Sequence, residues 1–175
     1  MNYLEKIRNI FIHQMQIIMD GEENISQALP ALMKKTESGK IFDFLASVSK
    51  SQNKILAYLN KTFTLLNVNK SKYTDSVIQT LLSEESQTLK NYCVAHASAE
   101  TAISIYYHTI AAYQVEMYET AVDCAAELGN ANIFDLISEC LKEKKIINNK
   151  IRILEESFNR QANKNFELDE NLIYS

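Results

Sequence analysis

The sequence predicts an all-α protein in which four long helices form an antiparallel bundle. Its 175 residues include three glycines and one proline, and 46% of them are hydrophobic. This composition favours helices over sheets, and the length fits a single domain. Apolar residues recur three and four positions apart in four segments, which places each set on one helix face. These segments are residues 3–35, 40–66 and 99–128, and a last one that ends near Arg160.

The first two segments are expected to form a hairpin. Pro30 lies near the end of the first segment, where it removes the hydrogen bond to residue 26 and bends the last turn. Residues 36–39, with the sequence Thr-Glu-Ser-Gly, form a tight connection. The second helix therefore returns antiparallel to the first.

The last two long segments are also expected to form a hairpin. Ser98 is suited to cap the N-terminus of the third helix, and Gly129 is suited to follow its C-terminus. Either Asn130 or Asn132 caps the fourth helix. Beyond Arg160 the chain is polar and acidic, so we expect a bundle of residues 1–160 and a tail of residues 161–175.

Residues 67–98 connect the two hairpins and include a short amphipathic helix over residues 74–92. Its apolar side is expected to carry Val77, Leu81 and Leu89, and its charged side Glu84 and Glu85. A connection of this length can recross the bundle, as in ferritin-like proteins, whereas a simple up-down-up-down bundle would not need it. The predicted fold is therefore a ferritin-like antiparallel four-helix bundle with a long crossover and one additional short helix.

Each long segment carries one polar residue in the middle of its apolar seam. These residues are Glu22, Gln52, Gln114 and Lys144. Because an isolated polar group in a core is costly, we expect the four to share one layer and to satisfy one another. Dimetal carboxylate proteins place their ligands at this level of a four-helix bundle. Here the layer has one carboxylate, two amides and one ammonium instead.

Lys144 leaves two arrangements open. An ammonium and a divalent metal are alternative ways to neutralise a carboxylate, so Glu22 and Lys144 can form a buried ion pair. Gln52 and Gln114 would then complete the remaining hydrogen bonds. Alternatively, the Lys144 stem lies along the helix while its ammonium reaches solvent. Both arrangements disfavour a bound metal.

Two stretches carry a resemblance to a known family. They are residues 17–33, IIMDGEENISQALPALM, and residues 113–129, YQVEMYETAVDCAAELG; residues 136–151 also fit. These stretches resemble the YciF-like family, ferritin-like bacterial stress proteins of unknown biochemical function. The resemblance extends over nearly the whole chain in the order and length of its elements. It implies a ferritin-like bundle and a stress-associated role.

The resemblance also shows where this chain departs from the family. Glu22 matches an acidic position on the family's first helix. The third helix of the family usually reads Glu-His-Tyr-Glu, and the fourth reads Glu-Glu followed by Asp. On the third helix the residues at these positions are Ala111, Ala112, Tyr113 and Gln114. On the fourth helix they are Glu143, Lys144 and Asn148. On the second helix, residues around Ser51 and Gln52 stand at the family's acidic positions. The resemblance thus implies that acidic positions are lost on three of the four helices and that the polar layer is what remains of a metal site.

The alternative hypothesis is a metal-binding or metal-oxidising protein with an atypical site. Its ligands would be Glu22, His108 and Glu143. Di-iron bundles need a Glu-x-x-His turn on two helices, and the sequence contains no such turn. Cys93 and His96 form a lone Cys-x-x-His pair that has no evident second pair of ligands. We therefore expect no metal, no cofactor and no catalytic residue.

Charge and hydropathy exclude several classes of partner. The net charge is −4 and the pI is about 5.4, so no basic surface for nucleic acid or an anionic membrane is expected. No apolar stretch approaches the ~18 residues of a transmembrane helix, and the N-terminus lacks a signal-peptide pattern. The three cysteines are odd in number and lie in helical segments, so we expect reduced thiols and a cytoplasmic protein.

The leading functional hypothesis is a non-catalytic helical bundle protein that forms a homodimer. Tyr106, Tyr113 and Phe42 cannot all face one core, so some of these side chains are expected to meet another subunit. Isologous dimers are also the commonest soluble assembly. A further possibility is a helical adaptor that binds a partner helix through its aromatic surface.

Overall fold

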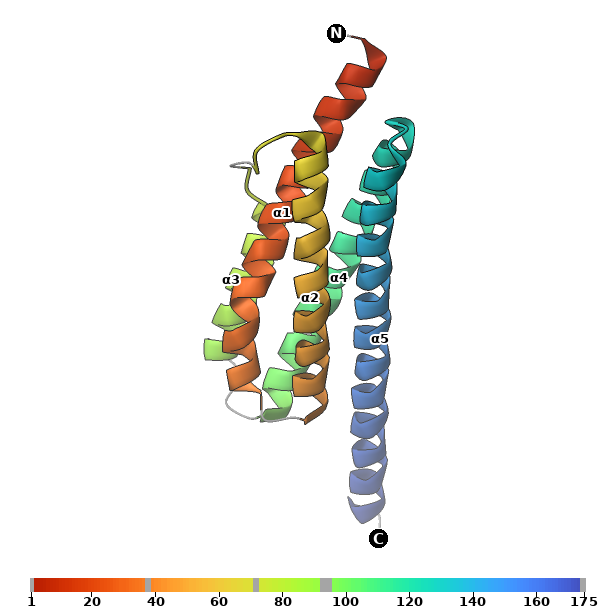
Figure 1. The fold of residues 1–175 in the computed structure, drawn as a ribbon. Coiled ribbons are helices and arrows are strands. Elements are labelled where there is room, and N and C mark those ends of the chain that lie inside the picture. Colours follow the sequence, from red (N-terminus) through yellow and green to blue (C-terminus); the bar gives the residue numbers. More distant parts are fainter. Residues whose placement is uncertain (1, 37–38, 71–72, 92–95, 174–175) are drawn as a thin grey trace.

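The computed structural model describes residues 2–36, 39–70, 73–91 and 96–173 (Figure 1). Within these ranges the chain forms five helices and no strand. The helices are α1 (Tyr3–Lys35), α2 (Gly39–Leu66), α3 (Ser76–Asn91), α4 (His96–Glu127) and α5 (Ala131–Ile173). The predicted all-α class is confirmed.

The four long helices form a bundle in which every pair of neighbours is antiparallel. α1 and α2 form one hairpin and α4 and α5 the other, and the hairpins meet through contacts of α1 with α4 and of α2 with α5. The short helix α3 runs back along the bundle, against α1 and α4, so that α2 and α4 point in the same direction (Figure 1). This is the predicted crossover topology.

The helix ends follow local capping chemistry. Asn2 caps α1, since its side chain accepts a hydrogen bond from the Glu5 amide at 2.8 Å and its own amide donates to the Glu5 carboxylate at 2.8 Å. Gly129 has φ +67°, the left-handed conformation that favours glycine after a helix. Asn130 caps α5, because its side chain accepts from the Ile133 amide at 3.2 Å. The predicted cap at Ser98 is wrong, because α4 already begins at His96.

The last helix is longer than predicted. We expected it to end near Arg160, but α5 continues to Ile173. The physical reason is that residues 131–173 contain no glycine or proline to interrupt the helix. The loss of apolar residues after Arg160 therefore does not end the helix. The division into a bundle of residues 1–160 and a tail of residues 161–175 stays a prediction.

The buried face of the short helix α3 matches the predicted one only in part: Leu89 is buried and Leu81 packs against the core, as predicted. Val77 is 44% exposed, while Ile78 is fully buried and Glu85, expected on the charged side, is only 1% exposed. The reason is the position of the N-cap: Asp75 accepts a hydrogen bond from the Ile78 amide at 3.0 Å, which fixes where the helix starts. Ile78, Glu85 and Leu89 then lie on one face at helical spacing.

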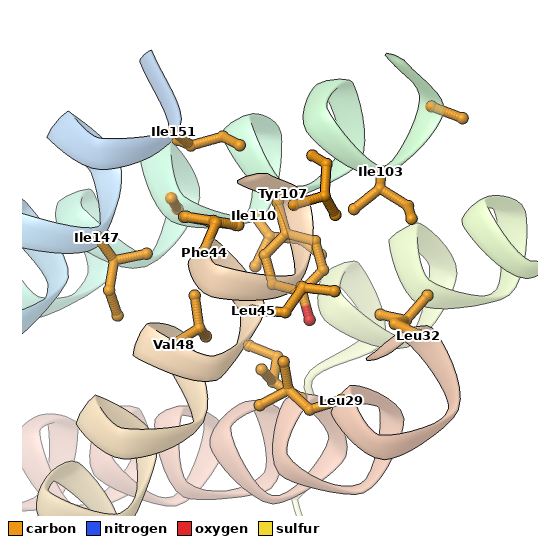
Figure 2. Packing of buried hydrophobic residues seen from close by; sticks show 14 of the residues in the cluster. Leu29, Leu32, Phe44, Leu45, Val48, Ile103, Tyr107, Ile110, Ile147 and Ile151 are labelled. Atoms are coloured by element: carbon orange, nitrogen blue, oxygen red, sulfur yellow. The ribbon is translucent and has the colours of Figure 1, made fainter. Parts of the chain in front are cut away.

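The hydrophobic core is divided into two clusters by the polar layer. One cluster contains Phe44, Leu45, Ile103 and Tyr107 (Figure 2), and the Phe44 and Tyr107 rings meet edge to face with centroids 5.8 Å apart. The other cluster contains Phe11, Met15, Leu59, Tyr118 and Cys140, at the opposite end of the bundle. Along each long helix, the polar residue stands where the chain passes from one cluster to the other.

Candidate functional site

The four mid-seam polar residues meet at the centre of the bundle. The Lys144 ammonium lies 2.7 Å from Glu22 Oε2, 3.0 Å from Gln114 Oε1 and 3.5 Å from Gln52 Oε1. Side-chain exposure is 1% for Lys144 and 0% for Glu22. Lys144 therefore forms an internal ion pair and does not reach solvent. Three oxygens from three helices surround one cationic nitrogen.

The Glu22 carboxylate is satisfied on both oxygens. Its Oε1 accepts a hydrogen bond from the Tyr118 hydroxyl at 2.8 Å. Its Oε2 accepts from the Gln52 amide as well as from Lys144. The Gln52 amide also donates to the backbone carbonyl of Glu22 at 2.8 Å. All four long helices thus contribute a side chain to one hydrogen-bonded network, which fixes their register.

Tyr118 is the member of this network that the sequence analysis did not identify. It is 1% exposed, and burial together with the Glu22 carboxylate raises the pKa of its hydroxyl well above the usual value. The hydroxyl therefore stays protonated and serves as a donor. Its position four residues after Gln114 on α4 was the available signal, because residues four apart share a helix face.

Cys140 lies one turn before Lys144 and is fully buried. Burial, followed by the Glu22 carboxylate, raises the pKa of this thiol. A thiol without thiolate character is a poor nucleophile and a poor metal ligand. Cys140 is therefore a core residue beside the polar layer.

The donor set of the layer does not fit a metal. A divalent ion in such a bundle needs several carboxylates or imidazoles, and this layer offers one carboxylate, two amides and one tyrosine hydroxyl. The Lys144 ammonium already occupies the point at which the oxygens converge. Among the residues that the structure describes, no group of three His, Cys, Asp or Glu side chains could hold a metal ion.

The residues of the atypical site are not brought together. His108 Nδ1 lies 2.6 Å from Glu155 Oε2 on the surface. The Glu143 carboxylate accepts hydrogen bonds from Ser51 at 2.6 Å and from Lys54 at 2.8 Å. The bond from Lys54, and to a smaller extent the bond from Ser51, lower the pKa of Glu143. Glu22 belongs instead to the central network. Cys93, of the Cys-x-x-His pair, lies outside the described residues.

A second group of buried polar atoms lies under α3. Glu85 is 1% exposed. Among the residues that the structure describes, its Oε1 has no hydrogen-bond partner, and the hydroxyls of Tyr107 and Ser104 on α4 have none either. Burial raises the pKa of Glu85 to about 8, although the positive charge of Lys35 acts in the opposite direction. The negative charge of Glu85 adds to burial in raising the pKa of Tyr107. This group is buried but unsatisfied.

Asp75 fastens the start of α3 to α1. The Asp75 amide donates to Asp20 Oδ2 at 2.8 Å, and the Tyr113 hydroxyl donates to Asp75 Oδ1 at 3.3 Å. A Cβ at Gly21 would lie 2.7 Å from Asp75 Oδ2, so the close approach of the cap to α1 favours glycine at this position. Burial raises the pKa of the Asp75 carboxyl. Asp75 thus has a structural role at the crossover.

The fold and the central layer define the class of protein: an all-α antiparallel helical bundle with a crossover helix and an ion pair at its centre. The chain belongs to the family described as a domain of unknown function (DUF892), which matches residues 6–164. This result confirms the YciF-like resemblance.

Two solved structures have a similar fold. The stress protein YciF of E. coli has a TM-score of 0.82 at 17% identity, covering 91% of this chain and 99% of that one. YcfI from Rhodopseudomonas palustris, described as a candidate structural protein, has a TM-score of 0.79 at 23% identity, covering 83% and 92%. Identities this low show the fold alone. Among proteins with curated descriptions, none has a sequence that matches this chain.

The long helices differ from membrane-spanning helices. In the part of the chain that the structure describes, no helix is both long enough and apolar enough to cross a membrane. The apolar residues Ile103, Tyr107 and Ile110 of α4 are buried in the core, and Gln114 follows them on the same face. The apolar surface of α4 is therefore used within the bundle.

Proposed function

We propose that this chain is a non-catalytic helical bundle protein in which a fixed ammonium group takes the place of bound metal. One observation carries the proposal. The Lys144 nitrogen lies where side-chain oxygens of Glu22, Gln114 and Gln52 converge, at 2.7, 3.0 and 3.5 Å. An internal cation held in this way neutralises the carboxylate without needing a bound ion. The layer then serves to set the register of four helices.

Elemental analysis of the purified protein tests this proposal. Expressed with added iron, manganese or zinc, the wild-type protein should contain none of them stoichiometrically. Two equivalents of iron per chain would overturn the proposal and favour a metal-oxidising protein with an atypical site.

A variant of the central layer tests whether this layer is the remnant of a metal site. Lys144→Glu combined with Gln114→Glu would place three carboxylates around the point that the ammonium now occupies, and should bind about one Mn²⁺ per chain by calorimetry. The matched control, Lys145→Glu with Asn53→Glu, makes the same change in charge at two exposed positions and should bind none. A folded double variant that ignores metal would show that the layer has no such ancestry.

We also propose a stress-associated role in the cytoplasm. The support is that a protein of the same fold is described as a stress protein, and that Cys124 and Cys140 are free thiols, as reducing compartments favour. The amount of the protein should rise at least about threefold after osmotic or oxidative stress, measured by quantitative immunoblotting of fractionated cells. An unchanged amount, or recovery outside the cytoplasm, would count against this assignment.

The protein is further proposed to be a homodimer. Phe42 is 45% exposed, as expected of an apolar residue reserved for a second subunit. Tyr106, in contrast, has a partner within the chain, because its hydroxyl lies 3.0 Å from Thr88 Oγ1. Light scattering at high micromolar concentration should give twice the mass of the chain, and a monomer mass would sink the proposal.

A further inference from the structure

The crossover helix α3 is held to the bundle by a small buried face. Three of its residues are buried, Ile78, Glu85 and Leu89, while Leu81 and Leu82 pack against the core and stay partly exposed. α1, by comparison, buries nine residues. α3 lies at the edge of the bundle, where it packs against α1 and α4 (Figure 1). The attachment of α3 therefore depends on few apolar side chains.

An acidic residue lies in the middle of this buried face. Glu85 follows Ile78 by seven residues and precedes Leu89 by four, so the three side chains lie along one side of the helix. Glu85 is 1% exposed, and its Oε1 accepts no hydrogen bond from any of the described residues. A buried carboxyl without a donor costs free energy, and an ionised carboxyl costs more than a neutral one. Glu85 thus opposes the docking of the helix that carries it.

The neighbouring surface of α4 also contains buried polar groups. Ser104 and Tyr107 lie one turn apart on α4 and are each 2% exposed. In the part of the chain that the structure describes, neither hydroxyl has a hydrogen-bond partner. Figure 2 shows the Tyr107 ring reaching from α4 toward Leu29 and Leu32 of α1. Water that enters when α3 moves away would hydrate polar groups of both α3 and α4, which favours the detached state.

The charges that face Glu85 do not compensate it. From α1, the positive charge of Lys35 lowers the pKa of Glu85, but burial outweighs this effect and raises the pKa to about 8. Lys35 is exposed, so solvent weakens its attraction. From α4, Tyr107 faces Glu85 as a neutral hydroxyl, because burial raises the pKa of this tyrosine. Docking of α3 therefore favours the neutral Glu85 carboxyl, whereas water favours the ionised one.

The contacts that fasten α3 are separate from those that join the long helices. The central network connects α1, α2, α4 and α5 through Glu22, Gln52, Gln114 and Lys144. Near the two ends of α3, the Asp75 amide donates to Asp20 at 2.8 Å, and the hydroxyls of Thr88 and Tyr106 lie 3.0 Å apart. Because these end contacts lie outside the central network, they can break while the network persists.

We propose that α3 is a pH-sensitive element that detaches from α1 and α4 when Glu85 ionises, while the four long helices stay folded. The docked pKa of Glu85 is about 8, and the pKa of a hydrated glutamate is about 4.3. Between these values the docked helix holds more protons than the detached one, so a rise in pH favours detachment. Detachment uncovers the apolar surface against which Ile78 and Leu89 pack, in the cluster that includes Leu32 and Ile103.

Hydrogen exchange measured by mass spectrometry tests this release. The opening constant of the α3 amides is obtained at pH 5.5, 6.5 and 7.5, after correction for the intrinsic exchange rate at each pH. In the wild type it should rise about tenfold per pH unit, because one proton is lost on opening. Amides in the middle of α1 and α2 should have opening constants at least about a hundredfold smaller at pH 7.5, since they exchange only when the bundle unfolds.

Two substitutions on α3 separate Glu85 from its neighbour. Glu85→Gln should abolish the pH dependence of α3 opening and lower the opening constant at pH 7.5 at least about tenfold. Glu84→Gln removes the same charge at an exposed position of the same helix. This control should keep the wild-type opening constant at every pH. Circular dichroism of each variant shows that it is folded.

Three results would overturn the proposal. An α3 opening constant that does not change with pH would mean that Glu85 ionises without moving the helix. Equal opening constants in α3 and α1 would mean that α3 exchanges only when the whole bundle unfolds. A pH dependence that persists in Glu85→Gln would assign the effect to another group, such as Asp75, whose pKa is also raised by burial.

Discussion

Two buried carboxylates in this molecule differ in their hydrogen-bond partners. Glu22, in the centre of the bundle, is 0% exposed, and Glu85, under the crossover helix α3, is 1% exposed. Glu22 accepts hydrogen bonds from Tyr118, Gln52 and Lys144. Glu85 has an oxygen that accepts no hydrogen bond from any of the described residues. Equal burial therefore accompanies very different electrostatic environments.

The difference follows from what surrounds each group. Four long helices converge on Glu22 and each can contribute a polar residue, so the charge is compensated where it lies. Glu85 lies on α3 near Lys35 of α1 and Tyr107 of α4, and burial raises its pKa to about 8. The centre of the bundle thus holds the charged Glu22 carboxylate, whose hydrogen bonds are complete. The crossover helix instead carries Glu85, whose buried carboxyl is more stable in its neutral form.

The largest expected effect comes from breaking the satisfied site. Lys144→Met leaves the Glu22 carboxylate buried without its cation, and should lower the free energy of unfolding by about 3–5 kcal/mol in urea denaturation. Lys145→Met is the control, because this neighbour is 54% exposed and pairs with Glu119 on the surface. Glu22→Leu combined with Lys144→Met should recover most of the loss. Losses that simply add would show that the two groups are not coupled.

The second effect comes from relieving the unsatisfied site. A glutamate titrates near ~4.3 in an unfolded chain, and the folded pKa of Glu85 is about 8. Between these values the folded protein holds more protons, so Glu85 lowers stability progressively as the pH rises. Glu85→Gln removes this dependence.

The gain from Glu85→Gln should therefore be small at pH 4.5 and grow by several kcal/mol as the pH rises toward 8. Urea denaturation at a series of pH values measures it. Glu84→Gln is the control, because Glu84 is exposed on the same helix and its removal should not change the slope. A gain that is equal at every pH would mean that Glu85 is ionised throughout, and the comparison with Glu22 would break.

The third effect compares the hydroxyls of two buried tyrosines. Tyr118 donates to the Glu22 carboxylate at 2.8 Å, whereas the Tyr107 hydroxyl has no partner. Tyr118→Phe removes a hydrogen bond to a charged group and should cost about 2 kcal/mol in the free energy of unfolding. In the Glu22→Leu/Lys144→Met background the same change should cost much less. An equal loss in both backgrounds would assign it to packing of the ring.

The central layer was predictable from sequence because its residues interrupt regular seams. A polar residue between apolar neighbours at helical spacing has to be buried or to break the helix, so the four positions were evident. Which arrangement Lys144 adopts was left open by the sequence, because a lysine stem permits both burial and solvent contact. Tyr118 was missed, since a tyrosine in a seam is compatible with ordinary core packing.

The crossover was less predictable. Apolar residues in α3 are few, so Val77 and Ile78 were equally suitable for the buried side, and the sequence assigned Glu85 to solvent with its neighbour Glu84. The cap at Asp75 and its approach to Gly21 decide the register. That contact joins residues far apart in the chain, and local periodicity carries no information about it. The length of α5 was missed for another reason: the helix was expected to end where apolar residues become few, although no glycine or proline interrupts residues 131–173.

The smallest expected effect completes the comparison. Tyr107→Phe removes a buried hydroxyl that has no hydrogen-bond partner, so no bond is lost and the desolvation penalty of the group disappears. The free energy of unfolding should change by less than ~0.5 kcal/mol or rise slightly, measured by urea denaturation beside Tyr118→Phe. A loss as large as that of Tyr118→Phe would mean that a bound water or Glu85 itself satisfies this hydroxyl in solution. The crossover would then be a satisfied site like the central layer, and Glu85→Gln should no longer stabilise the protein.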